Sequence, residues 1–390
     1  MWYSQSLAAV WLVLEFGLVY ALGLAIYRIY LHPLRRIPGP KHFAVSGLPQ
    51  AIDNQFRGVF TRKVLHFHEK YGDIVRTGPN HVHMNGTIGW PEVFGHTRSG
   101  RPEFSHWDNF YQRRLLAHAF SDAAIKEQEA LIKQYVDKLF DQLRKEAAQE
   151  GPTDMLQWYN FTTFDIIGDL VFGEPFHCLD NSNYHPWISM IFASIRAGAG
   201  MMALLRMPLL HWILRLIVSK EDIQKRNEHK AMSIEKAERR IALGPAPNGR
   251  KDIMTYILRH NDEKGMTHQE ILGNSEALIV AGSETTATAL SGLTYYISTN
   301  LQALNYVQRE VRAAFRTEEE ITMASTTHLR YLHACIEEAM RVYPPVVETP
   351  PRISPGEYVN GNWIPKGTFI TIHQWAVYHN PSNFAHPDEG

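Results

Sequence analysis

The residues best suited to chemistry lie together in the segment 280–289, VAGSETTATA. Glu284, an acid, stands beside the hydroxyl of Thr285 inside an apolar stretch with the length of a helix. A glycine in a helix interior costs about 1 kcal/mol relative to alanine, so helix stability does not explain Gly282. An acid next to an alcohol suits the delivery of protons to a bound oxygen species.

The spacing in this segment predicts one face of small residues. Ala281 lies four residues before Thr285 and Gly282 three before it, and such residues are neighbours on a helix. This face would leave a groove in which a flat ligand could approach the backbone, with Glu284 at its edge to relay protons. The alternative is a glycine-assisted helix crossing with a solvent-facing acid, and the segment alone leaves both open.

A second pair follows later in the chain. Glu338 and Arg341 are three residues apart on an expected helix, followed by Pro344 and Pro345. Such a pair is common on exposed helices and contributes only a few tenths of a kcal/mol. Because the pair follows AGSETT in the chain and has the double proline behind it, the combination is a specific sequence motif.

A long helix must position the first segment. Thr267 and Glu270 have the spacing of a capping box, and no proline follows until well past Thr299. A helix of about 33 residues would be some 50 Å long, enough to cross a domain.

The other expected elements make the chain mainly helical with a small β region. We expect one helix over 121–151, a second that ends near Gly173, and a third over 219–243 with a solvated charged face. Two later helices are expected to extend through Val311 and through Arg341. We expect a loop at 244–250, strands within 71–84 and at 368–372, and a turn at Asn360-Gly361. The apolar segment 187–218 is either a core helix or a membrane-facing lid.

The N-terminus has the pattern of a membrane anchor. Residues 7–27 are apolar except for Glu15, and as a helix they would span about 31 Å, the thickness of a bilayer core. Basic residues follow the stretch and none precede it, so we expect the rest of the chain to be cytoplasmic. A cleaved signal peptide is the alternative. The expected organisation is an anchor at 1–28, a proline-rich spacer at 29–41 and a catalytic domain at 42–390.

Composition excludes several classes of function. A net charge of −1 gives no basis for nucleic-acid binding. Two cysteines, Cys178 and Cys335, form no disulfide framework and indicate a reducing compartment. We assign no metal site to the histidine pairs 66/68 and 81/83, because alternate residues share a face only on a strand and no carboxylate–histidine helix motif accompanies them.

Taken in order, these motifs resemble those of the cytochrome P-450 family of heme-thiolate monooxygenases, especially fungal microsomal members of secondary metabolism. The likeness covers most of the chain and includes the apolar N-terminus, IPGPK (37–41), YGDIVRTGPN (71–80), RRLLAHAFS (113–121), FDIIGDLVFG (164–173), AGSETT (281–286) and Glu338-x-x-Arg341. The resemblance implies a cytochrome P-450 fold, a heme b cofactor and electrons from NADPH-cytochrome P-450 reductase.

The resemblance also implies roles for individual residues. Ala281 and Gly282 would flank the heme, and Glu284 and Thr285 would form the acid–alcohol pair for oxygen activation. Glu338 and Arg341 would brace the heme-side core. Arg113 and Arg352 would contact the heme propionates.

Two departures from the family pattern stand out. The region 105–112 is short, and Asn109 occupies a position where the family has an aromatic residue or histidine. The family's cysteine ligand loop would follow FAHPDE (384–389) and does not occur in this chain. Neither Cys178 nor Cys335 has the sequence context to replace it, so no residue is assigned as the iron ligand and the chain is expected to be inactive.

The leading interpretation is therefore a single-pass endoplasmic reticulum protein of the monooxygenase type, whose substrate is a lipophilic metabolite such as a terpenoid or polyketide. One alternative is a non-catalytic, membrane-anchored remnant or binding protein. Another is a helical membrane scaffold unrelated to heme.

Overall fold

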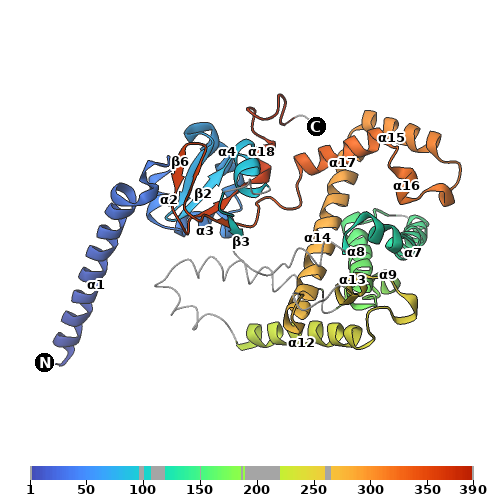
Figure 1. Ribbon diagram of the computed structural model, residues 1–390, viewed down its shortest axis with the longest axis horizontal. Helices are drawn as coiled ribbons and strands as arrows, with labels where there is room; N and C mark the ends of the chain where they lie inside the picture. The colour runs from blue at the N-terminus through green and yellow to red at the C-terminus, as the bar shows by residue number, and fades with distance from the viewer. Residues whose placement is uncertain are drawn as a thin grey trace. The chain divides into compact units, whose positions relative to one another are not determined.

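The computed structural model describes residues 2–95, 101–106, 119–149, 151–185, 188, 220–259 and 265–388. They belong to two compact units, whose elements are labelled in Figure 1. Unit 1 contains the described residues up to 106 and from 346 onward, and unit 2 contains those between 119 and 345. The architecture is mainly helical with a small sheet region, which confirms the expected fold class.

Unit 1 is organised around a five-stranded sheet with the strand order β1-β2-β7-β4-β3. Its strands are β1 (Ile74–Gly78), β2 (His81–Met84), β3 (Ser105–His106), β4 (Arg352–Ile353) and β7 (Phe369–Thr371). Neighbouring strands are antiparallel except β2 and β7, which run parallel and pair His81 with Phe369. The strands expected within 71–84 and at 368–372 are confirmed, and they share one sheet.

A separate hairpin joins β5 (Glu357–Val359) to β6 (Asn362–Ile364). Its two turn residues, Asn360 and Gly361, have φ values of 44° and 73°. Asparagine and glycine tolerate positive φ, and this pair matches the twist of the flanking strands. The predicted turn is confirmed.

Short helices complete unit 1, and the expected spacer packs into its core. The helices are α2 (Lys41–Val45), α3 (Leu48–Ala51), α4 (Phe60–Tyr71), α5 (Gly86–Gly89) and α18 (Gln374–Tyr378), with π-helical turns at Tyr27–Leu31, Ile52–Phe56 and Trp90–Phe94 and a 3-10 turn at Pro33–Arg36. Leu34 and Ile37 are buried among strand residues of the unit.

The segment expected to anchor the chain forms helix α1 (Trp2–Ile26). Within the part of the chain that the structure describes, no helix combines the length and the apolar character needed to cross a membrane. Helix α1 covers the expected segment as far as Ile26, and its role as an anchor stays a prediction.

Unit 2 is a set of helices that follows the sequence expectations closely. They are α7 (Asp122–Ala147), α8 (Met155–Phe172), α9 (Cys178–Asn181), α12 (Lys220–Ala242), α13 (Ile253–Arg259), α14 (His268–Thr299), α15 (Leu301–Ala314), α16 (Met323–Thr326) and α17 (Arg330–Val342), with 3-10 turns at Pro247–Gly249 and Glu318–Glu320. The capping box of α14 is present, with the backbone N–H of Thr267 donating to Glu270 at 2.7 Å. Gly173 ends α8 in the left-handed region.

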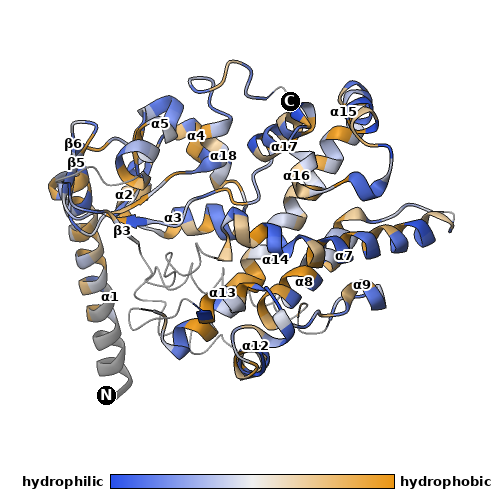
Figure 2. Ribbon diagram, turned by 45° about the vertical axis from the view of Figure 1, so that its right-hand side comes forward, coloured by the Kyte–Doolittle hydropathy of each residue, from blue (hydrophilic) through white to orange (hydrophobic). Residues whose placement is uncertain are grey.

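Helix α8 lies at the centre of the core of unit 2. Most of its 18 residues are buried. In Figure 2 α8 and α13 are largely orange, whereas α7 shows alternating hydrophobic and hydrophilic stripes. This pattern fits α7 as an amphipathic helix with one buried face.

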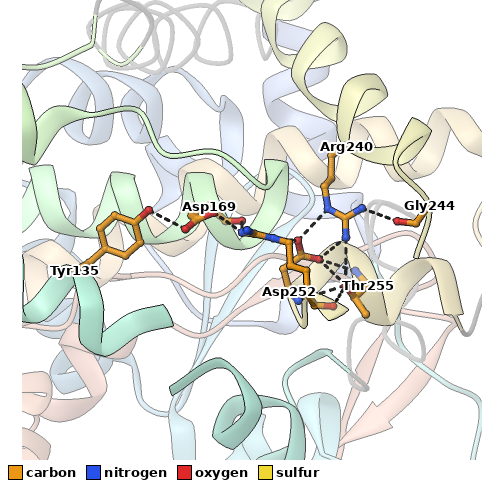
Figure 3. Close-up of polar contacts among 7 residues, drawn as sticks. Tyr135, Asp169, Arg240, Gly244, Asp252 and Thr255 are labelled. Atoms are coloured by element: carbon orange, nitrogen blue, oxygen red, sulfur yellow. Dashed lines mark hydrogen bonds and ion pairs between the residues drawn. The ribbon is translucent and has the colours of Figure 1, made fainter. Parts of the chain in front are cut away.

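A buried ionic network connects α12 and α13 to α8 (Figure 3). Arg240 is fully buried, and its Nε and Nη2 donate to the two oxygens of Asp252 at 2.9 and 2.8 Å. Arg250 bridges Asp252 to Asp169 on α8. Burial alone would raise the pKa of Asp252, but the paired guanidinium groups lower it. The expectation that 219–243 presents only a solvated face is thus corrected at Arg240, because its charge is paired inside the unit.

Several predicted features lie outside the described residues. These are Arg113, Asn109, most of the short region 105–112 and, apart from the buried Ile188, the apolar segment 187–218.

Candidate functional site

The hydroxyl groups of the AGSETT segment are bonded within helix α14. Ser283 donates to the carbonyl of Ile279 at 2.6 Å, Thr285 to that of Ala281 at 2.6 Å, and Thr286 to that of Gly282 at 2.9 Å. Each bond reaches back four residues, a pattern that satisfies the hydroxyl but slightly weakens or bends a helix. The three hydroxyl groups are therefore satisfied within the helix itself.

Gly282 lies where α14 crosses α8. A Cβ placed on it would be 2.9 Å from Cδ1 of Ile167. Ala281 is exposed, while Thr285 is half-buried. The glycine therefore serves close helix packing, and the small-residue face expected for a flat ligand depends on Ala281 and Thr285.

Glu284 is the chemically distinctive residue of this segment. Its Oε2 is buried and has no hydrogen-bond partner among the described residues. Burial raises the pKa of its carboxyl group. Burial and the nearby charge of Glu284 also raise the pKa of Tyr184. A half-buried acid with a raised pKa can hold a proton that an exposed glutamate would release.

Glu338 and Arg341 form a bidentate ion pair on α17. Nε of Arg341 donates to Oε2 of Glu338 at 2.7 Å, and Nη2 donates to Oε1 at 2.7 Å. The arginine side chain is 11% exposed and that of the glutamate 41%. Glu338 also lines a groove of about 240 Å³ between α14, α15 and α17, together with Leu293, Tyr296 and Cys335.

Arg352 belongs to the sheet of unit 1. It is 5% exposed, and its Nη1 donates to the carbonyl of Phe104 at 3.2 Å. Its guanidinium group lies 5.4 Å from the ring centre of Phe94. The arginine expected beside it at the cofactor, Arg113, lies outside the described residues.

A second group of side chains in unit 1 was missed in the sequence. His81, His83 and Glu348 could hold a metal ion, judged by the spacing of their ligating atoms. Burial alone would raise the pKa of Glu348, but the hydrogen bond and charge of His83 lower it to about 2. The histidine pair was dismissed because alternate residues share a face only on a strand, and residues 81–84 do form strand β2. The alternation itself was the available signal, whereas Glu348 is 265 residues from His83.

Comparison with known proteins identifies the family. A family model described as Cytochrome P450 matches residues 102–389. The chain belongs to the cytochrome P450 family. The cytochrome P450 monooxygenase aclL of Aspergillus oryzae is 38% identical over 399 residues, which cover 96% of this chain and 81% of the relative. The trichothecene C-15 hydroxylase of Fusarium sporotrichioides is 36% identical over 396 residues, covering 96% and 80%. The cytochrome P450 monooxygenase lcsI of Purpureocillium lilacinum is 36% identical over 400 residues, covering 95% and 77%.

As a cytochrome P450 the chain is a monooxygenase of the heme-thiolate type, and its family implies heme b as the cofactor. The middle of α14 would fit beside such a flat group, because Ala281 is small and exposed and Glu284 offers a buried oxygen without a partner among the described residues.

The two cysteines do not fit the iron. Cys178 is fully buried, and burial raises the pKa of its thiol to about 12. Burial also raises the pKa of Cys335. A metal ligand must be the thiolate, and burial disfavours that form at both residues.

Proposed function

We propose that this cytochrome P450 oxidises a lipophilic secondary metabolite, such as a terpenoid or polyketide, and that Glu284 and Thr285 control the protons of the reaction. The observation that carries the proposal is the carboxyl group of Glu284, with its raised pKa and its buried oxygen. The substrate class is supported by the apolar sequence 187–218 and by relatives that include a trichothecene C-15 hydroxylase.

Heme, when bound, supplies the redox chemistry for inserting oxygen into a C–H bond. Ala281 leaves room for it beside α14. Glu284 holds a proton next to Thr285, whose hydroxyl rests on the carbonyl of Ala281 and can rotate to pass the proton on. We assign the brace of the heme-side core to Glu338 with Arg341, and propionate contacts to Arg113 and Arg352.

The proposal is tested by removing one hydroxyl at a time. In a version of the chain extended with the family's cysteine ligand loop, Thr285→Ala is expected to lower the fraction of consumed oxygen that appears as product several-fold while heme content stays the same, because the hydroxyl acts on protons and not on the iron. Thr286→Ala is the matched control, since its hydroxyl makes the same type of bond, 2.9 Å to the carbonyl of Gly282, from an exposed position. An equal loss of coupling in both variants would contradict the proposal.

We further propose that the enzyme works at the endoplasmic reticulum membrane with NADPH-cytochrome P-450 reductase, organised as an anchor (1–28), a spacer (29–41) and a cytoplasmic catalytic domain (42–390). The support is helix α1, on which Trp11, Phe16 and Tyr20 are 64%, 74% and 72% exposed. Large exposed apolar surface of this kind favours contact with a membrane.

Membrane attachment through α1 predicts a simple fractionation result. The full chain is expected to stay with the membrane pellet in high salt, because apolar contacts are not screened. Deleting residues 2–26 should move it to the supernatant. Retention of the deleted form in the pellet would show that another part of the chain makes the contact.

A further inference from the structure

Two histidines and one glutamate converge in unit 1. Strand β2 places His81 and His83 on one face, with their rings stacked and the ring centres 4.8 Å apart. Nε2 of His83 lies 3.0 Å from Oε1 of Glu348. One ligating atom from each of the three residues lies within 4.8 Å of the other two.

Threonine hydroxyls hold both imidazole rings in place. Oγ1 of Thr77 on β1 lies 2.6 Å from Nδ1 of His83, and Oγ1 of Thr371 on β7 lies 2.9 Å from Nε2 of His81. β1, β2 and β7 are neighbours in the sheet, so the hydrogen-bonded strands fix these contacts. A polar partner on the second ring nitrogen is typical of histidines that bind metals, because it sets the orientation and the tautomer.

A further imidazole lies against this group. His373 is 1% exposed, and its ring centre is 6.3 Å from that of His83. Its Nδ1 is buried and has no hydrogen-bond partner among the described residues. A buried polar atom without a hydrogen-bond partner costs about 1–3 kcal/mol of stability. Binding a metal ion would remove this cost, so this nitrogen is a candidate for a further metal ligand.

We propose that His81, His83 and Glu348 bind a divalent transition-metal ion of the Zn²⁺ type. Two imidazoles and one carboxylate are a common zinc ligand set, which leaves a fourth position for water or His373. With metal–ligand distances of about 2.0–2.2 Å, ligand atoms lie about 3.5 Å apart, so the side chains need to move by about 1 Å. The ion would tie β2 to the segment before β4 and stabilise unit 1, which is a role separate from the oxidation chemistry.

The site is tested on the full chain after dialysis against EDTA and re-equilibration with zinc chloride. We expect about one zinc ion per chain by elemental analysis and a Tm several degrees higher with zinc than without, because an ion that binds only the folded state stabilises it. Glu348→Gln and His81→Asn keep the size of the side chains and are expected to weaken zinc binding at least tenfold in a calorimetric titration.

His66→Asn is the matched control. His66 and Glu69 form an exposed histidine–glutamate pair on α4, 3.5 Å apart, in the same unit. Zinc binding should be unchanged in this variant. The absence of bound zinc, or binding that Glu348→Gln and His81→Asn leave intact, would overturn the proposal and leave His83 and Glu348 as a hydrogen-bonded pair. If Glu348→Gln fails to fold, the half-buried His81 decides the matter, and a Tm of the unaltered chain that does not respond to zinc would also count against the site.

Discussion

At the scale of single residues, burial decides which groups are available for chemistry. Glu284 and Glu338 are both acids on helices, and their sequence contexts look equally suggestive. Glu338 is engaged by Arg341 in two hydrogen bonds, whereas one oxygen of Glu284 is buried without a partner among the described residues. The raised pKa of Glu284 follows from this burial, so it is the residue suited to hold and release a proton.

The cysteines give a prediction at the same scale. Replacing Cys178 or Cys335 with alanine is expected to leave the reduced carbon monoxide spectrum of the heme-loaded protein unchanged. Burial raises the pKa of both thiols, so neither supplies a thiolate at neutral pH. A shift of the Soret band in one variant alone would identify that cysteine as the iron ligand.

At the scale of the elements, α8 is the helix on which the others depend. Gly282 allows α14 to approach it, and Asp169 near its C-terminus accepts a hydrogen bond from Tyr135 on α7 at 2.7 Å. Arg250 extends the same contacts to Asp252, which pairs with Arg240 on α12 (Figure 3). The positions of α7 and α12 on α8 are thus fixed partly by buried charges, which are costly to leave unpaired.

Breaking this network is expected to destabilise unit 2 strongly. Asp252→Asn removes the negative charge opposite the fully buried Arg240 and should lower the free energy of unfolding by about 3 kcal/mol. Asp137→Asn is the control, because the Lys133–Asp137 pair is exposed and should change stability by less than about 1 kcal/mol. Urea unfolding followed by circular dichroism measures both, and similar midpoints for the two variants would argue against the network.

At the scale of the whole molecule, the two units differ in how their buried groups respond to acid. Unit 1 holds His68, which is 6% exposed and whose Nδ1 donates to the carbonyl of Gly72 at 3.0 Å. Burial is the main reason that its pKa is lowered from 6.5 to about 4; the charge of His83 also lowers it, while the Gly72 bond and Asp73 oppose the shift. The charged groups of the buried network in unit 2 are instead carboxylates paired with arginines.

This difference predicts a loss of stability of unit 1 in mild acid. Between pH 6.5 and 4 the unfolded chain binds a proton at His68 that the folded chain does not, so stability falls as the pH decreases through this window. The effect of one such histidine is at most about 3 kcal/mol. Urea unfolding at about pH 7 and about pH 4.5 measures it, and His68→Gln should show a smaller decrease. The same decrease in both proteins would assign the pH dependence to other groups.

Local signals in the sequence determined the helices and turns of this protein. The Thr267–Glu270 capping box, the glycine that ends α8 at position 173 and the Asn360-Gly361 turn were all correctly predicted. They act over four residues or fewer, so the chain carries the full information at each place. The motifs in the same way indicated the cytochrome P450 family, which the comparisons show.

Only the tertiary structure decided which residues meet. Gly282 packs on Ile167, Arg240 is buried against Asp252, and His83 reaches Glu348. In the sequence, the role of Gly282 was open between ligand binding and a helix crossing, Arg240 belonged to an expected solvated face, and His83 was assigned no metal site. Periodicity reveals which face of an element is apolar, but not which distant element will cover it. The partners of a glycine, a charge or a histidine are set by that long-range packing, and so are the burial and the pKa that give each group its chemistry.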